Sequence, residues 1–220
     1  MAKVDYRLNG IVDVDNLGGE NLPVLARLAA DNGVTILQYR DKNSDTRAMI
    51  ERAREIRAAL AGTGVPLLIN DRVDVALAAE ADGVHIGQED MTPADARALL
   101  GPDRIIGLTV KNEADGQAAR SSPIDYACAG GVFATASKEN PDKPIGTEGL
   151  RKIIAQIKAS RPDMPVGAIA GIDLSNVPEV IAAGADGIAV ISAIFRAQDP
   201  AKAARDLRHA VDRALSERAS

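Results

Sequence analysis

The sequence of 220 residues is poor in cysteine, histidine and aromatic residues. A single cysteine, Cys128, rules out a disulfide within the chain and gives no cysteine cluster for a metal, so we expect a reducing, cytoplasmic location. The aromatic residues are Tyr6, Tyr39, Tyr126, Phe133 and Phe195. With so few rings for base stacking and a formal net charge of −5, the chain lacks the surface typical of nucleic-acid binding. We therefore expect no nucleic-acid partner.

Long apolar runs and linkers are also missing. No run is long enough to span a bilayer, and residues 1–5 lack the apolar core of a signal peptide. No low-complexity tract and no stretch rich in proline, glycine and serine divides the chain. Because a chain of this length can bury a sizeable core, we expect one domain covering residues 1–220 and no membrane association.

What the sequence does contain is a regular alternation of short β-branched runs with longer segments of helical period. Several of the short runs are apolar throughout, which is typical of strands buried on both faces. The expected strands are residues 8–12, 34–38, 65–69, 83–86, 105–109, 126–130, 166–170 and 187–191.

The segments between these runs are amphipathic, with apolar residues on one helical stripe and charged residues opposite. Two such stripes are Met49, Ile50, Ala53, Ile56 and Leu60, and Leu150, Ile153, Ile154 and Ile157. The sequence Thr-Pro-Ala-Asp at residues 92–95 predicts a helix start, because it offers a capping hydroxyl, a proline at the first helical position and an acid three residues on.

Three connections from helix to strand share a signature, at residues 31–34, 81–84 and 185–188, in which we expect glycine to end the helix and a β-branched residue to begin the strand. Eight strands, each followed by a helix, predict an α/β fold, a single (β/α)8 barrel. A doubly wound open sheet is the alternative. It is weakened because no Gly-x-Gly-x-x-Gly follows the first strand.

Polar residues gather where the expected strands end, which is where the active sites of such barrels lie. Gln38, Arg40 and Lys42 follow the second strand, and alternation along an extended chain turns their side chains to the same side. These cations suit the oxygens of a phosphorylated ligand. A solvated, charged loop is the alternative interpretation.

Carboxylates follow the next two strands, with Asn70 and Asp71 after the third and Asp90 soon after the fourth. Neighbouring strand ends allow Asp71 and Asp90 to share one Mg²⁺ that keeps some of its waters. Taken alone, Asp71 is better explained as the N-cap of a helix beginning at Arg72, and Asp90 as an exposed loop acid. His85 fits a structural strand residue better than a catalyst.

The remaining strand ends carry hydroxyls and glycine. Thr109 ends the fifth strand, and the longest connection in the chain, residues 130–146, follows the sixth. This connection fits a substrate-covering loop or a plain surface loop, and it carries Thr135, Ser137 and Lys138. Barrels often bind a phosphate at the ends of the last two strands, near Gly171 and Ser192, although Gly171 also fits a simple tight turn. No Cys–His or Ser–His pair lies at this end, which disfavours covalent catalysis.

Six segments, in order, carry a resemblance to a known family. They are Gln38-x-Arg40-x-Lys42, Asn70-Asp71-Arg72-x-Asp74-x-Ala76, Gly83-Val84-His85-x-Gly87-Gln88-x-Asp90, Phe133-x-Thr135-x-Ser137-Lys138, Ala168-Ile169-x-Gly171-Ile172 and Val190-Ile191-Ser192. Over essentially its whole length the chain resembles the thiamine-phosphate synthases. The resemblance implies a (β/α)8 barrel that uses Mg²⁺ to join hydroxymethylpyrimidine diphosphate to thiazole phosphate, giving thiamine phosphate and pyrophosphate.

The resemblance also implies a role for each matching residue. The pyrimidine diphosphate site would comprise Gln38, Tyr39, Arg40, Asp41, Lys42, Asn70, Thr109 and Lys138. The thiazole phosphate site would comprise Thr135, Ala136, Ser137, Gly171, Ile191 and Ser192. Asp71 and Asp90 would hold the Mg²⁺, and Arg40, Lys42, Thr109 and Lys138 would be the catalytic residues. The implied mechanism is dissociative, with the pyrimidine carbocation captured by the thiazole nitrogen.

The chain departs from the family pattern at a few positions. Thr109 and Ser137 exchange one hydroxyl residue for the other, and Gly131 and Ala134 replace frequent prolines. Ala170 replaces the first glycine of a Gly-Gly pair, which puts a methyl group beside the expected phosphate site. None of these departures removes a charged or metal-binding group.

Three rival functions remain open: a thiazole tautomerase, a non-catalytic barrel that binds thiamine precursors, and a generic sugar-phosphate enzyme. None of them needs the full set of residues expected for the diphosphate and the metal, so all three are disfavoured. The small-molecule substrates are the expected partners, and a homo-oligomer is left open.

Overall fold

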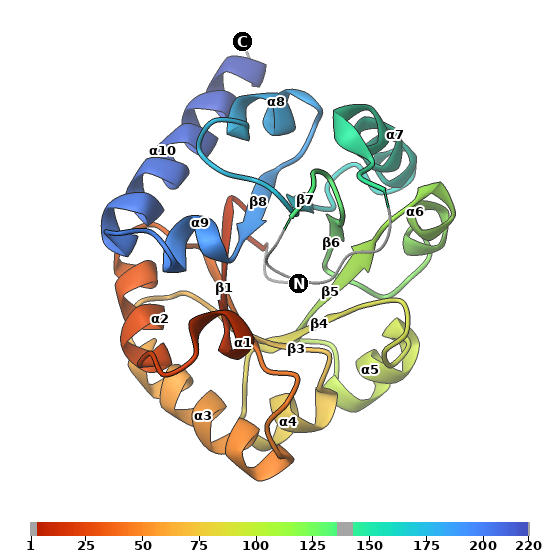
Figure 1. The fold of residues 1–220 in the computed structure, drawn as a ribbon. Coiled ribbons are helices and arrows are strands. Elements are labelled where there is room, and N and C mark those ends of the chain that lie inside the picture. Colours follow the sequence, from red (N-terminus) through yellow and green to blue (C-terminus); the bar gives the residue numbers. More distant parts are fainter. Residues whose placement is uncertain (1–3, 136–142, 220) are drawn as a thin grey trace.

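The computed structural model describes residues 4–135 and 143–219. Eight parallel strands follow one another around a closed barrel, and helices surround it (Figure 1). The strands are β1 (Leu8–Asp13), β2 (Ile36–Arg40), β3 (Leu67–Asn70), β4 (Gly83–Ile86), β5 (Ile105–Val110), β6 (Tyr126–Ala129), β7 (Val166–Ile169) and β8 (Gly187–Val190). The helices are α1 (Val14–Leu17), α2 (Leu22–Asp31), α3 (Thr46–Ala59), α4 (Val73–Ala78), α5 (Pro93–Leu100), α6 (Glu113–Ala119), α7 (Gly146–Lys158), α8 (Val177–Ala182), α9 (Ser192–Phe195) and α10 (Pro200–Ala219).

The predicted barrel is confirmed, and the alternative of an open sheet is wrong. The sheet closes because β8 pairs with β1, with Leu8 opposite Ile188. The expected bounds are right for β4 and differ by one or two residues elsewhere. β2 and β3 each begin two residues later than expected. At β2, which begins at Ile36 rather than Val34, the reason is that Thr35 joins β2 to β1 in the way described below.

The helices bury the stripes that their sequences predict. In α3, Met49, Ala53 and Ile56 are buried against the barrel, and in α7 the four predicted apolar residues are all buried. The start of α5 is also as predicted, because the Thr92 hydroxyl accepts a hydrogen bond from the Asp95 N–H. Among the described residues, no helix is long and apolar enough to cross a membrane.

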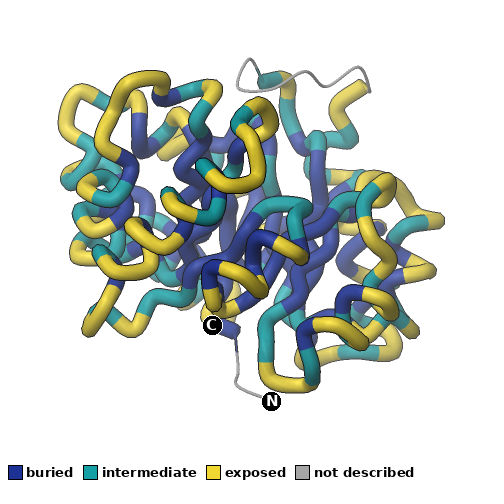
Figure 2. The backbone as a smooth tube through the Cα atoms, turned by 90° about the horizontal axis from the view of Figure 1, so that it is seen from below, coloured by how far each residue is buried: buried dark blue, intermediate teal, exposed yellow. Residues whose placement is uncertain are grey.

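Alternation along the strands separates two layers of core. Ile36, Leu68, Tyr126 and Cys128 belong to a small cluster inside the barrel, whereas their neighbours along the strands, such as Leu37, join the larger cluster between strands and helices. In Figure 2 the buried backbone lies in the middle of the molecule and the exposed backbone around the periphery. The strand position of a residue therefore decides whether its side chain faces the barrel interior or the helices.

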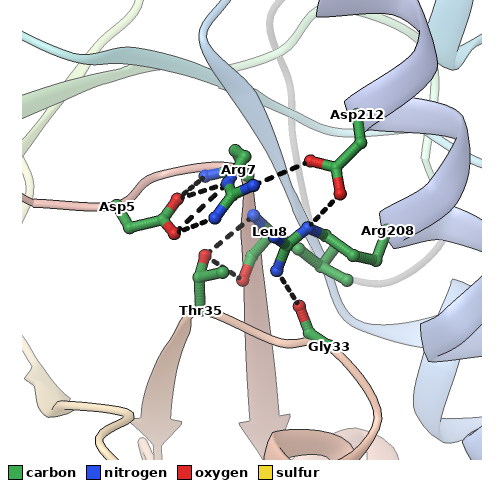
Figure 3. Close-up of polar contacts among 7 residues, drawn as sticks. All are labelled: Asp5, Arg7, Leu8, Gly33, Thr35, Arg208 and Asp212. Carbon is green, nitrogen blue, oxygen red and sulfur yellow. Dashed lines mark hydrogen bonds and ion pairs between the residues drawn. The ribbon is translucent and has the colours of Figure 1, made fainter.

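At the N-terminal end of the strands, four side chains fasten the strands in pairs. Asp82, Asp125 and Asp186 stand just before β4, β6 and β8. Each donates its own N–H to the carbonyl of a residue on the preceding strand, and accepts that residue's N–H on its carboxylate; the partners are Leu67, Ile106 and Val166. Thr35 does the same toward Leu8 through its hydroxyl (Figure 3). We call these four residues the base clamps. They join β1 to β2, β3 to β4, β5 to β6 and β7 to β8.

The base clamps also revise the interpretation of the repeated signature. Gly33 has a positive φ of 109° and follows α2, as expected for a helix end. The expectation is wrong for Gly83 and Gly187, which are the first residues of their strands. A Cβ on Gly83 would lie 2.0 Å from the Ile105 carbonyl oxygen, so this glycine is needed where two strands approach closely.

Candidate active site

Alternation along β2 divides the five predicted residues that follow one another there. Gln38 and Arg40 lie on the same side of the strand as Ile36, which is inside the barrel, and Gln38 is buried. Tyr39 instead belongs to the outer core between strands and helices. The structure therefore brings Gln38 and Arg40 to the mouth of the barrel, the end formed by the carboxyl ends of the strands.

Tyr39 and Asp41 are not brought into the mouth, because they bond to α3. The Tyr39 hydroxyl donates to Asp41 Oδ2 at 2.7 Å, and Arg52 donates to the same oxygen at 2.8 Å. Burial alone would raise the pKa of Asp41, but hydrogen bonds from Ser44, Tyr39 and Asn43 outweigh it and lower the pKa. Burial and the neighbouring Asp41 raise the pKa of Tyr39. The side chains of both residues thus hold the loop after β2 rather than face a ligand.

Arg40 is held in the mouth by a residue that the sequence did not single out. The fully buried carboxylate of Asp13, at the end of β1, lies 2.6 Å from Arg40 Nη1, and Asp15 lies 3.5 Å from the same nitrogen. Asp13 also accepts the N–H groups of Asp15 and Asn16, which fixes its carboxylate at the start of α1. The only available signal in the sequence was an acid at the end of the first strand.

Lys42, Asp71 and Asp90 form a charged cluster just after the ends of β2, β3 and β4. The Lys42 ammonium pairs with the Asp71 carboxylate, and the Asp90 carboxylate accepts the Gly87 N–H at 2.7 Å. Burial raises the pKa of Asp71, and a hydrogen bond with Asp90 raises it further, partly offset by Lys42. The two carboxylates that the sequence predicted to meet are therefore brought together.

The alternative role for Asp71 as a helix cap is wrong. The N-cap position of α4 is Arg72, and no side chain caps this helix. Asp71 instead has a positive φ of 64°, a conformation that aspartate tolerates better than most residues, and its N–H donates to the His85 carbonyl. The turn directs the Asp71 carboxylate toward Asp90 and Lys42 rather than along α4.

The donor set fits Mg²⁺. Among residues 4–135 and 143–219, no group of three or more histidine, cysteine, aspartate or glutamate side chains is placed to hold a metal. Mg²⁺ is commonly bound by one or two carboxylates together with substrate phosphates and water. Asp71 and Asp90 match this pattern, since a cation between them would relieve the interaction that raises the pKa of Asp71.

The middle strands place Asn70 and Thr109 at the mouth. Asn70 ends β3 and is paired in register with His85 of β4. The Thr109 hydroxyl lies 2.8 Å from His85 Nε2, and the Tyr126 hydroxyl lies 2.8 Å from His85 Nδ1. His85 is thus a buried strand residue with both ring nitrogens in hydrogen bonds, and no pattern in the sequence pointed to these two partners.

A small cavity of about 50 Å³ lies at the ends of β7 and β8. Four predicted residues line it, namely Thr135, Gly171, Ile191 and Ser192. Gly171 has a φ of 63°, and a Cβ there would lie 2.4 Å from the Ala134 carbonyl oxygen. Its lack of a side chain therefore gives room to the loop that leads to Thr135. Ala170, the methyl-bearing departure from the family pattern, also lines the cavity and has a φ of 89°.

Three predicted residues, Ala136, Ser137 and Lys138, lie outside the described residues. Tyr39 and Asp41 face α3, and the remaining predicted residues divide into two groups at one end of the barrel. One group, from β2 to β5, contains the charged residues. The other lines the cavity between β7 and β8, where none of the described lining residues is charged. A closed (β/α)8 barrel with polar residues gathered at the carboxyl ends of its strands is the arrangement of a barrel enzyme.

Comparisons with known proteins identify the family. Residues 8–194 match the family model described as thiamine monophosphate synthase. A thiamine-phosphate synthase of Agrobacterium fabrum is 64% identical over 218 residues, which is 99% of each chain. One of Xanthobacter autotrophicus is 46% identical and covers 94% of this chain and 96% of its own. The chain therefore belongs to the thiamine monophosphate synthase family, a family of transferases.

A solved structure supports the same assignment. The thiamine phosphate pyrophosphorylase from Pyrococcus furiosus superposes with a TM-score of 0.85 at 39% identity, covering 98% of this chain and 100% of the other. A 3-hexulose-6-phosphate synthase superposes with a TM-score of 0.61 at only 20% identity, which shows the shared barrel fold and nothing more.

Proposed function

We propose that this chain joins hydroxymethylpyrimidine diphosphate to thiazole phosphate, with release of pyrophosphate. The observation that carries the proposal is the pairing of two unlike sites at one mouth. Lys42 pairs with Asp71, which lies against Asp90, and Arg40 ends the neighbouring strand β2. Among the described residues, those that line the cavity between β7 and β8 carry no charge. The first arrangement suits a diphosphate with its metal, and the second suits a monophosphate.

The charged site would bind the diphosphate and take up the charge that develops when it leaves. Arg40 and Lys42, with Lys138, would donate hydrogen bonds to the phosphate oxygens, and Thr109 would add a hydroxyl. Gln38 and Asn70 would bind the pyrimidine end. Asp71 and Asp90 would hold Mg²⁺, which when bound would neutralise diphosphate oxygens. Stabilising these oxygens favours breaking the bond between the pyrimidine methylene carbon and the leaving pyrophosphate.

The uncharged site would hold the second substrate in position to react. Thr135, Ser137 and Ser192, with backbone at Gly171 and Ile191, would bind the phosphate of the thiazole. Anchoring the phosphate places the thiazole nitrogen near the methylene carbon, so that attack becomes a step between two held partners. No proton has to be removed from this nitrogen, which agrees with the absence of carboxylate and histidine side chains among the described residues that line this cavity.

The test is formation of thiamine phosphate from the two purified substrates, with Mg²⁺ and then with EDTA. We expect thiamine phosphate to form only when Mg²⁺ is present, and pyrophosphate to be released in an amount equal to the thiamine phosphate. If thiazole phosphate binds but no product forms, the proposal is wrong and a tautomerase or a precursor-binding protein becomes the better interpretation. A cytoplasmic location, one domain over residues 1–220 and a possible homo-oligomer stay predictions.

A further inference from the structure

The strongest unassigned feature is a chain of hydrogen bonds that runs from the barrel interior to the mouth. The Tyr126 hydroxyl, His85 and the Thr109 hydroxyl are joined through the two ring nitrogens of His85, each at 2.8 Å. Tyr126 is fully buried and His85 is 7% exposed, whereas Thr109 is only half-buried. One end of the chain is therefore sealed in the core and the other reaches the proposed diphosphate site.

The strands are built to allow this contact. His85, Gly107 and Tyr126 lie side by side on β4, β5 and β6, with Gly107 paired to both of the others. A Cβ on Gly107 would lie 2.0 Å from Cζ of Tyr126 and 2.2 Å from its hydroxyl oxygen. The glycine thus leaves the space through which the phenol ring crosses β5 to reach His85. Two residues further along β5 is Thr109, which contacts the other nitrogen of the same ring.

The buried phenol decides the direction of the hydrogen bonds. A buried hydroxyl without an acceptor is costly, and among the described residues His85 Nδ1 is the hydrogen-bond partner of Tyr126. The Tyr126 O–H therefore donates to Nδ1, which requires that Nδ1 carry no proton. A neutral imidazole with an unprotonated Nδ1 has its hydrogen on Nε2, and Nε2–H then donates to Thr109 Oγ1. Burial raises the pKa of Tyr126 well above its usual value, so this phenol keeps its proton.

We propose that Tyr126 and His85 are positioning residues that orient the Thr109 hydroxyl as a donor to the substrate. Because Thr109 Oγ1 accepts from His85, its own hydrogen is left to point into the mouth, toward an anionic oxygen or a ring nitrogen of the pyrimidine diphosphate. In the opposite tautomer, Thr109 would donate to His85 and offer the substrate only an acceptor. The inference deepens the proposed function and rests on it for the identity of the ligand that Thr109 meets.

The direct test is the tautomer of His85 in the ligand-free protein, measured by long-range ¹⁵N–¹H correlation NMR. The chain has two histidines, so His209→Gln leaves only the signals of His85. We expect the Nε2–H tautomer with Nδ1 unprotonated. A proton on Nδ1, alone or together with one on Nε2, would overturn the inference. This measurement needs no substrate, so its outcome is separate from that of the product assay.

A pair of variants tests the contact to Tyr126. In Tyr126→Phe the phenol donor is lost, and we expect the Nδ1 resonance to move toward the position of an unbonded ring nitrogen. The matched control is Tyr6→Phe, because Tyr6 packs on Tyr126 with ring centroids 4.8 Å apart and is equally buried, but does not bond to His85. We expect no movement of the Nδ1 resonance in the control. Equal movement in both variants would contradict the inference.

Kinetics then test whether the hydrogen bonds from Tyr126 through His85 affect turnover through Thr109. We expect Tyr126→Phe to lower kcat about tenfold with little change in the KM for thiazole phosphate, and Thr109→Ala to lower kcat at least as much. The double variant should be no slower than Thr109→Ala, because both changes remove the same oriented donor. Thr109→Ser should keep most of the activity. Fully additive losses in the double variant would show that Tyr126 does not act through Thr109.

Discussion

The two ends of this barrel use similar side chains for opposite purposes. At the base, the end formed by the N-terminal ends of the strands, Asp125 accepts the Ile106 N–H at 2.8 Å and pairs with Arg97 at 2.6 Å. A backbone N–H and a cation together therefore neutralise its charge. At the mouth, Asp71 and Asp90 approach each other, with Lys42 on Asp71, and burial and proximity raise the pKa of Asp71. A carboxylate that is fully paired within the protein stabilises the fold, whereas one that is close to its like is suited to bind a cation.

The largest expected effect of a single change at the mouth is that of Asp71→Asn. Loss of one of two metal carboxylates should lower turnover about 10²–10³-fold and raise the Mg²⁺ concentration needed for half-maximal rate. The measurement is the rate of thiamine phosphate formation across a Mg²⁺ titration. The control is Asp74→Asn, three residues on, whose side chain is 60% exposed and pairs with Arg72 at the surface. An unchanged Mg²⁺ dependence in Asp71→Asn would remove this residue from the metal site.

Asp13→Asn tests whether the mouth depends on support from β1. Asn keeps the shape of the side chain but weakens its hold on Arg40, so we expect kcat to fall about tenfold while the KM for thiazole phosphate stays the same. Asp15→Asn is the matched control, because Asp15 lies 3.5 Å from Arg40 and its side chain is 37% exposed. An equal effect of both changes would mean that Arg40 responds to the general charge of the mouth rather than to the buried pair.

A change at the base of the barrel should alter the free energy of unfolding and leave the rate of turnover unchanged. Asp125→Asn keeps one hydrogen-bond acceptor but loses the ion pair with the half-buried Arg97, and we expect the free energy of unfolding to fall by about 1–3 kcal/mol. Turnover should be unchanged at temperatures where the variant is folded. Denaturant unfolding and the product assay check the two halves of this prediction. Asp103→Asn, in the exposed loop before β5, should change neither quantity.

Asp41, which follows β2, extends the comparison. It lies near the mouth, yet its carboxylate is paired within the protein, by Tyr39 and Arg52, as that of Asp125 is at the base. The pKa of Asp41 is lowered in the folded protein. Its ionised form therefore stabilises the fold above the pKa of an unfolded aspartate, about 3.9, and this contribution is lost as the pH falls through the lower, folded pKa. We expect Asp41→Asn to be less stable by about 1–3 kcal/mol at pH 7.

The difference in unfolding free energy between Asp41→Asn and the unchanged protein should shrink below about pH 4. Urea unfolding at a series of pH values measures it. A difference that is constant from pH 7 to pH 3 would show that the charge of Asp41 is not what stabilises the loop after β2.

The smallest expected effect is at the edge of the uncharged cavity. Ala170 has a φ of 89°, which is unfavourable for a residue with a side chain by about 1–2 kcal/mol. Glycine relieves this strain but loses more entropy on folding, by about 0.5–1 kcal/mol. We expect Ala170→Gly to be more stable by about 0.5 kcal/mol, with turnover intact. Thermal unfolding at one protein concentration measures the change, and a loss of activity would show that the methyl group is required.

The sequence predicted the fold well because each strand and helix carries its own signal. Buried apolar runs and glycine-rich returns locate the eight strands, and α3 and α7 bury the stripes read from their sequence. The predicted strand ends differ from the observed ones where a side chain, rather than the backbone, makes the hydrogen bond to the neighbouring strand. Val34 and Thr35 read as strand, but Thr35 bonds sideways to Leu8 and β2 begins after it.

The site was predictable where one strand sets the geometry. A period of two placed Gln38 and Arg40 on one side, and the same rule places Tyr39 on the other, toward the helices. Contacts between side chains of different strands were not predictable, because the sequence of a single strand does not determine which residues of the neighbouring strand it pairs with. Asp13 meets Arg40 across β1 and β2, and His85 meets Tyr126 across β5, only because the barrel closes with its particular register.

The most direct test of the account measures turnover and unfolding together for Asp71→Asn and Asp125→Asn. Both variants exchange a carboxylate for an amide of the same shape, one at the mouth and one at the base. The account predicts that Asp71→Asn loses turnover and keeps its unfolding midpoint, while Asp125→Asn loses stability and keeps its turnover. Loss of both properties in both variants, or turnover that survives in Asp71→Asn, would contradict the division of roles between the two ends of the barrel.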